Sequence, residues 1–273
     1  MVKQDLFETP EVTRFLGCFN VTANPLSDTE KFLESLRQLD PRYKGDRSLV
    51  RYQLEADTTA WFLETQQIIM ATAEAMGMLK KETPLKDDWD FVIVLGGARQ
   101  APLDRLRYAI HSITFNEALV GMMTIVGSAR KLLPEEQNAV KNYAPNAKTE
   151  FDLCTAAAKT VYRESPSIWV GQWFVNDEQA SSTRAICTVI HDVILQDMTH
   201  MPYIAAVTTQ IYTCATEFDL ARVAREYGIK KTFVAGNPSD PELVARRTTA
   251  TYLSEVLRTL RAAAMYFAAI GGK

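Results

Sequence analysis

Up to about Thr83, apolar side chains recur with the period of amphipathic helices, and no strand-like alternation interrupts them. The run Thr9-Pro10-Glu11 joins an N-cap residue to a proline in the first turn, which predicts the start of a helix. Ser27-Asp28-Thr29-Glu30 predicts a second start, and a long helix is expected from about Ser48 to Leu79. The first part of the chain is therefore predicted to be helical.

Beyond this region the pattern changes to short apolar runs that end in glycine or polar residues. Such continuous runs are typical of strands buried on both faces, as in parallel sheets. The predicted strands span residues 91–95, 118–126, 167–175, 203–207 and 232–235.

Helical patterns separate these strands, and a long amphipathic helix from about Pro241 to Ala269 closes the chain. Alternating strands and helices predict parallel strands joined by right-handed crossovers. The expected fold class is α/β, with a Rossmann-like, mostly parallel sheet of about five strands and helices on both faces. Residues 1–85 are predicted to form a helical extension packing on the core, and residues 86–273 the Rossmann-like domain.

The string Thr-Glu-Phe-Asp-Leu occurs at both 149–153 and 216–220. Threonine followed three residues later by aspartate resembles a capping box, so both copies are predicted to begin helices. The repeated string is explained better by the residue preferences at helix N-termini than by an internal duplication.

The composition is that of an ordinary globular protein, with 47% hydrophobic and 23% charged residues and a formal charge of −3. A charge this small argues against broad electrostatic binding to nucleic acid, although it permits a local cationic pocket. The N-terminal residues lack a signal-peptide pattern, and no apolar run is long enough to span a bilayer. We therefore expect a cytoplasmic protein that binds neither membranes nor nucleic acid.

Metal and hydrolase chemistry find little support in the sequence. The four cysteines are far apart and form no CxxC pair, which favours reduced thiols over a zinc or redox site. The three histidines have no metal-ligand spacing such as HExxH, and no serine lies in a GxSxG elbow. No metal site and no standard Ser–His–Asp hydrolase are expected.

The candidate site lies at the carboxyl ends of the strands, where open parallel sheets bind ligands. Gly96-Gly97-Ala98-Arg99 follows the first predicted strand and precedes a helix start. The glycines permit close approach of the backbone, the helix start presents N–H groups, and Arg99 and Arg105 could bind phosphate or carboxylate. The alternative is a tight turn with solvated arginines, since neither GxGxxG nor a P-loop is present.

Two further turns extend this candidate ligand-binding site. Gly127-Ser128-Ala129-Arg130 repeats the order of glycine and arginine after the second strand. Glu178 follows the third strand and is predicted to bind a ribose hydroxyl or act as a base, whereas Thr183 beyond it lines the site or caps a helix. Thr208 and Thr209, at the end of the fourth strand, are expected on the same rim.

The order of these motifs between about Asp90 and Ala235 resembles the YdcF/SanA/ElyC-like domain family, whose architecture is Rossmann-like. The resemblance rests on Val92-Ile-Val-Leu-Gly-Gly-Ala, on Arg105 in the next helix, and on four further motifs. These are Ile125-Val-Gly-Ser, Thr149-Glu150, Glu178-Gln-Ala-Ser-Ser-Thr183-Arg and Val207-Thr-Thr209. The resemblance implies a nucleotide-type ligand, such as S-adenosylmethionine, for some members and envelope roles for others.

The chain departs from the family pattern in its fourth motif. Tyr212 and Ala215 stand where the family usually has a histidine and an arginine, and Ile186 lies near the place of an asparagine. Two hypotheses follow. The first is a protein, enzymatic or not, that binds an anionic or nucleotide-like small molecule, with a methyltransferase as a weaker variant of this class. The second is a non-catalytic interaction or scaffold protein that uses the helical extension.

Overall fold

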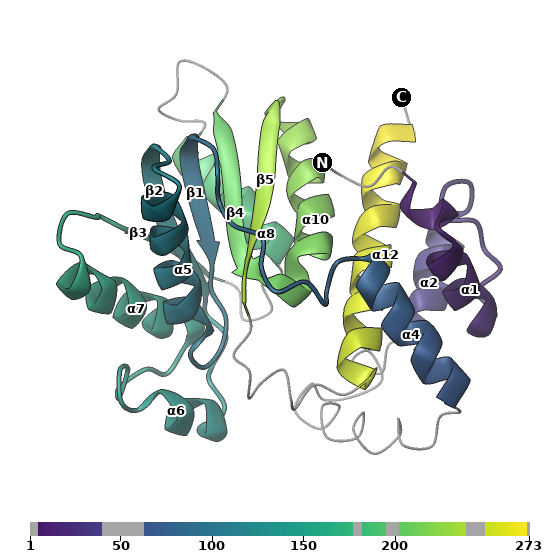
Figure 1. The fold of residues 1–273 in the computed structure, drawn as a ribbon, viewed down its shortest axis with the longest axis horizontal. Helices are drawn as coiled ribbons and strands as arrows, with labels where there is room; N and C mark the ends of the chain where they lie inside the picture. The colour runs from purple at the N-terminus through teal and green to yellow at the C-terminus, as the bar shows by residue number, and fades with distance from the viewer. Residues whose placement is uncertain (1–4, 40–62, 177–181, 195–201, 239–248, 272–273) are drawn as a thin grey trace. The chain divides into compact units, whose positions relative to one another are not determined.

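A computed structural model describes residues 5–39, 63–176, 182–194, 202–238 and 249–271 of the 273-residue chain (Figure 1). These residues belong to two compact units. One, the helical unit, comprises residues 1–80, 211–222 and 239–273, and the other, the sheet unit, comprises residues 81–210 and 223–238.

The sheet unit is built on five parallel strands in the order β3-β2-β1-β4-β5. This confirms the predicted Rossmann-like α/β fold, and each predicted strand is present. The strands are β1 (Trp89–Leu95), β2 (Val120–Ser128), β3 (Gly171–Val175), β4 (Tyr203–Thr209) and β5 (Lys231–Asn237). In the central strand, Val92, Ile93 and Val94 are fully buried, as expected for a strand covered on both faces.

Helices cover the sheet on both faces. The helix α5 (Ala101–Phe115) packs on β1, β4 and β5, and α7 (Glu150–Glu164) packs beside it on β2 and β3. The helix α8 (Ser182–Val189) lies behind the sheet in Figure 1, opposite α5, and continues into a π-helical turn, η4 (Ile190–Ile194). The short helix α6 (Pro134–Val140) precedes α7.

The strand order reverses between β1 and β4. From β1 the chain adds β2 and β3 toward one edge, then returns to place β4 on the other side of β1 and β5 beyond it. In open parallel sheets, ligands bind outside the carboxyl ends of the strands at such a reversal. The ends of β1 and β4 are therefore where a site is expected.

The start of α7 confirms one of the two predicted capping boxes. The Asp152 backbone N–H donates to Thr149 Oγ1 at 3.2 Å, and Asp152 Oδ2 accepts from the Thr149 N–H at 2.8 Å. The prediction for the second copy of the string is wrong. Thr216 lies inside α10 (Thr213–Glu226), where its fully buried side chain caps nothing. The string is compatible with both places because its residues also fit a helix interior.

Replacing Asp152 with asparagine is expected to lower the free energy of unfolding by about 1 kcal/mol at neutral pH, the usual cost of a lost cap. Desolvation opposes ionisation of Asp152, but hydrogen bonds from the Lys148 and Thr149 amides and the Thr149 hydroxyl hold its pKa below the ordinary value. This stabilisation is present above the unfolded-state pKa and is lost as pH falls through the lower folded-state pKa. Urea titrations of both proteins should therefore converge as the pH is lowered below about 4. An unchanged difference at low pH would contradict the assigned role.

The helical unit contains η1 (Leu6–Glu8), α1 (Pro10–Cys18), α2 (Thr29–Leu39), α4 (Leu63–Ala75), most of α10, and α12 (Thr249–Gly271). The short η5 (Gln210–Tyr212) precedes α10. Phe15, Phe32, Phe218 and Leu257 share one buried core in this unit. The C-terminal helix α12 packs on α2 and α4, whereas the sequence prediction grouped it with the sheet.

Two predicted helices differ from the observed ones in length. Of the helix expected from Ser48 to Leu79, residues 48–62 lie outside the described residues, and the remainder ends at Ala75. It ends there because Gly77, with φ of +78°, closes a turn in which the Met78 N–H donates to the Ala73 carbonyl. Residues 241–248 of the closing helix also lie outside the described part. No helix in that part combines the length and apolarity needed to cross a membrane.

Candidate anion site at the carboxyl ends of β1 and β4

Arg105 joins the two strands at the point where the sheet order reverses. It projects from α5, is only 5% exposed, and donates from Nη1 to the Leu95 carbonyl at 2.7 Å and to the Gly96 carbonyl. Its Nε donates to Thr209 Oγ1 at 3.1 Å. The positive charge of Arg105 is therefore held beneath the ends of β1 and β4.

The turn after β1 places Gly97 against this guanidinium, and Arg99 follows two residues later in the same turn. Gly97 has a backbone φ of +156°, which residues other than glycine rarely adopt. A Cβ at this position would lie 3.3 Å from Arg105 Nη1. Arg99 has φ of +57°, an uncommon conformation for a residue with a side chain. Its carbonyl accepts a 2.8 Å hydrogen bond from the hydroxyl of Tyr143, which holds the turn in place.

The guanidinium of Arg99 remains available. Its Nε is buried and has no hydrogen-bond partner, and within the described ranges no carboxylate pairs with the side chain. A buried donor without a partner is costly, and such groups often mark a place for a ligand or an ordered water. Of the two arginines at this site, Arg105 donates to the protein itself, whereas Arg99 has a buried N–H donor without a partner among the described residues.

Gly96 serves packing between β1 and β2. A Cβ at this position would lie 2.4 Å from the Val126 carbonyl oxygen and 2.9 Å from Cys154 Sγ. Burial raises the pKa of the Cys154 thiol, and the charge of Glu150 raises it further, against smaller opposing effects of Arg105 and Gly97. Cys154 is therefore a protonated, buried thiol, in agreement with the expectation from sequence.

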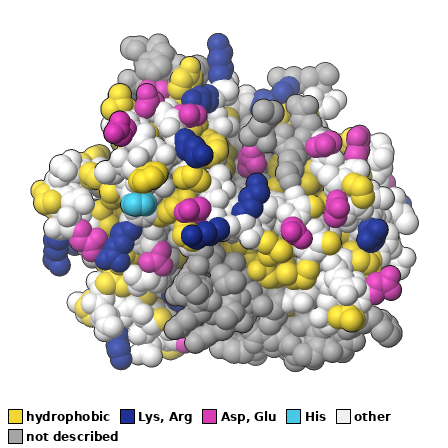
Figure 2. All heavy atoms as spheres, viewed as in Figure 1, with side chains coloured by type: hydrophobic (Ala, Val, Ile, Leu, Met, Phe, Trp, Pro, Cys, Tyr) yellow, Lys and Arg dark blue, Asp and Glu magenta, His cyan; other side chains and the backbone are white. Residues whose placement is uncertain are grey.

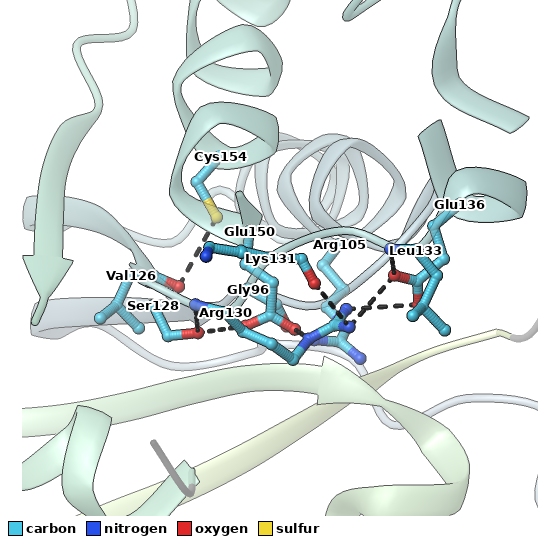
Figure 3. A network of polar contacts seen from close by, with 10 residues as sticks. All are labelled: Gly96, Arg105, Val126, Ser128, Arg130, Lys131, Leu133, Glu136, Glu150 and Cys154. Atoms are coloured by element: carbon cyan, nitrogen blue, oxygen red, sulfur yellow. Dashed lines mark hydrogen bonds and ion pairs between the residues drawn. The ribbon is translucent and has the colours of Figure 1, made fainter. Parts of the chain in front are cut away.

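The turn after β2 forms a closed ion-pair network (Figure 3). Arg130 donates from Nε to Glu150 Oε1 at 2.7 Å and from Nη1 to Glu136 Oε2 at 3.1 Å. Ser128 donates to Glu150 Oε2 at 2.5 Å, and Gly127 lets α7 approach because a Cβ would lie 2.7 Å from the Phe151 Cα. Desolvation lowers the pKa of Arg130, but Glu150 and Glu136 outweigh it and keep that pKa above its ordinary value.

The predicted site residues consequently fall into two groups. The structure brings together Gly96, Gly97, Arg99, Arg105 and Thr209 around the ends of β1 and β4, with Thr208 buried beside Thr209. Gly127, Ser128 and Arg130 belong to the network at the end of β2, where two carboxylates neutralise the arginine. Glu178 lies outside the described residues, as does the side chain of Thr183, which is in α8.

Sequence reasoning missed Asn237 at the end of β5. Asn237 is in register with Thr209, so the two side chains point to the same face of the sheet. It is 5% exposed, its Nδ2 donates to the Pro238 carbonyl at 3.1 Å, and its Oδ1 is buried without a partner. The signal was a polar residue directly after an apolar strand, the same signal that identified Thr208 and Thr209.

These features form a row along the carboxyl edge of the sheet: the Gly97–Arg99 turn, Arg105, Thr209 and Asn237. The row offers cationic donors on the β1 side and a neutral acceptor on the β5 side. Pro102 in the first turn of α5 marks a helix N-terminus that adds a positive dipole end near Arg99. Within the described part of the chain, no group of three or more His, Cys, Asp or Glu residues could hold a metal ion.

Comparison with known proteins gives relatives without an assigned function. No family model matches the chain. Uncharacterized proteins of Mycobacterium bovis and of two strains of Mycobacterium tuberculosis are 30% identical over 165 residues. The match covers 55% of this chain and 45% of each relative, so the chain spans about half the length of the curated relatives it matches. The resemblance to the YdcF/SanA/ElyC-like family stays a prediction.

Proposed function

We propose that the protein binds the anionic group of a nucleotide-like small molecule above Gly97, between the ends of β1 and β4. The observation that carries this proposal is the Arg99 guanidinium, which has a partly buried position and an unpartnered Nε. Arg105 lies below the same turn, so an anion there meets two positive charges in a partly desolvated place, where electrostatic attraction is stronger than in water.

The neighbouring groups favour a ligand with polar atoms in addition to its anion. Neighbouring parallel strands lie about 4.8 Å apart, so Asn237 lies about two strand spacings, or roughly 10 Å, from the end of β1. A nucleoside monophosphate has about this length, and its hydroxyl or amino groups are donors that Asn237 Oδ1 could accept. The resemblance stated above implies the same ligand class, with S-adenosylmethionine as one example.

Nucleic acid fits the charge distribution less well than a small molecule. The formal charge of the chain is −3, and on the face shown in Figure 2 basic side chains are scattered among acidic ones. Binding along a nucleic-acid backbone needs a concentrated basic surface.

Calorimetric titration with inorganic phosphate, AMP and S-adenosylmethionine tests the proposal. We expect at least one of these anions to bind, and Arg99→Ala to weaken that binding about tenfold or more, because a hydrogen bond between charged groups contributes roughly 1.5 to 3 kcal/mol.

The matched control is Arg107→Ala. Arg107 lies on α5 and its Nε donates to Glu164 at 3.0 Å, so its charge is already balanced at the surface. This variant should bind the same anion as tightly as the unchanged protein. Absence of binding by all three anions, or equal binding by the Arg99→Ala variant, would refute the proposed site.

A further inference from the structure

We infer that two copies of this chain pair edge to edge through β3, antiparallel and about a twofold axis at Trp173. The pairing would join two five-stranded sheets into one continuous sheet. This interface is independent of the proposed anion site, because it uses the opposite side of β2 from β1.

The two edge strands of the sheet, β5 and β3, differ in whether another segment of the chain hydrogen-bonds to their outer side. Along β5, Thr83 covers the edge: its N–H donates to the Gly236 carbonyl and its carbonyl accepts from the Gly236 N–H, both at 2.9 Å. The outer edge of β3 has no such cover among the residues that the structure describes. An open edge presents unpaired N–H and C=O groups that template pairing with another strand.

The backbone of β3 has the pattern that twofold pairing requires. The Ala129 N–H donates to the Val175 carbonyl at 3.1 Å, so the polar groups of Val175 point toward β2. Because the direction of the backbone N–H and C=O groups alternates along a strand, those of Trp173 also point toward β2. The backbone N–H and C=O groups of Gln172 and Phe174 point to the outer edge. In an antiparallel pair centred on Trp173, Gln172 of each copy opposite Phe174 of the other forms two reciprocal pairs of hydrogen bonds. The strand is therefore complementary to itself in this register.

The side chains favour a second copy over a charged partner. Gly171-Gln-Trp-Phe-Val175 contains no charged residue and no proline, the usual devices that protect an edge strand. Two copies would consequently place no like charges opposite each other. Phe174 is 46% exposed, and the centroid of its ring lies 5.1 Å from the centroid of the Phe151 ring. Trp169, whose ring lies beside Gly171, is 67% exposed. In the paired register Phe174 of one copy lies opposite Gln172 and diagonal to Phe174 of the other, and aromatic side chains at such diagonal positions are within reach of each other.

A charge-swap experiment tests the register. Light scattering after size-exclusion chromatography should give the mass of a dimer for the unchanged protein. The double variant Gln172→Lys with Phe174→Lys places like charges directly opposite, and should raise the dissociation constant of the dimer about tenfold or more. Mixing it with the double variant Gln172→Glu with Phe174→Glu should restore a dimer that contains one copy of each.

The control double variant is Phe115→Lys with Leu119→Lys. These residues are 77% and 73% exposed around the turn between α5 and β2, so the variant adds the same two positive charges at exposed positions away from the β3 edge. It should remain dimeric. A monomeric mass for the unchanged protein at all concentrations, a dimeric Lys double variant, or failure of the Lys and Glu variants to associate would each overturn the inference.

Discussion

Replacing Arg105 with leucine is expected to lower the free energy of unfolding of the sheet unit by about 3 to 5 kcal/mol. The guanidinium is almost fully buried and satisfies two carbonyls at the end of β1 and the hydroxyl of Thr209 on β4. Leucine fills part of the space but leaves these acceptors without a donor, and each buried acceptor without a partner costs roughly 1 to 3 kcal/mol. Tryptophan fluorescence during urea unfolding measures the effect, since Trp89, Trp169 and Trp173 lie in the sheet unit.

Arg107→Leu provides the comparison, because Arg107 is on the same helix and pairs with Glu164 at the surface. An exposed ion pair contributes at most about 1 kcal/mol, so this variant should unfold nearly as the unchanged protein does. If both variants unfolded alike, Arg105 would not act as the buried link between β1 and β4. The assignment matters for function, because it makes Arg105 chiefly a support for the turn that carries Arg99.

Local patterns in the sequence were sufficient to predict the sheet. A strand buried on both faces must be apolar at consecutive positions, as in Phe91–Leu95, and the chain alternates such runs with helical patterns. The same reasoning grouped α12 with the sheet, whereas its residues belong to the helical unit. An amphipathic pattern shows that one face of a helix is buried, but it does not identify the surface that buries it.

The candidate site shows a similar limit for individual side chains. The position of Arg130 after a glycine turn was the same signal as that of Arg99, yet the structure pairs Arg130 with Glu136 and Glu150. Those carboxylates come from positions 6 and 20 residues away in the chain, and their approach depends on how α6 and α7 pack. Sequence located the strand ends, but tertiary packing decides which arginine keeps its donors for a ligand.

Gly96→Ala is expected to destabilise the sheet unit by about 3 kcal/mol, because it forces β1, whose end carries the site, away from the neighbouring strand β2. The Gly96 N–H donates to the Val126 carbonyl at 2.8 Å, and a Cβ would lie 2.4 Å from that same oxygen. The obstacle is backbone rather than the end of a flexible side chain, and Cys154 Sγ at 2.9 Å blocks relaxation on another side. Overpacking of this kind usually costs about 1 to 3 kcal/mol and can cost more. Urea unfolding followed by tryptophan fluorescence gives the change.

Gly17→Ala is the matched substitution, since nothing lies within 4 Å of a Cβ at Gly17 in α1. Alanine there should leave stability unchanged or increase it by up to about 1 kcal/mol, because it favours the helix over the unfolded chain. A Gly96→Ala protein as stable as the Gly17→Ala protein would mean that β1 and β2 separate more easily than their hydrogen bonding indicates. In that case the Gly96-Gly97 turn would have room to move, and the fixed position of Arg99, on which the anion site depends, would have to be abandoned.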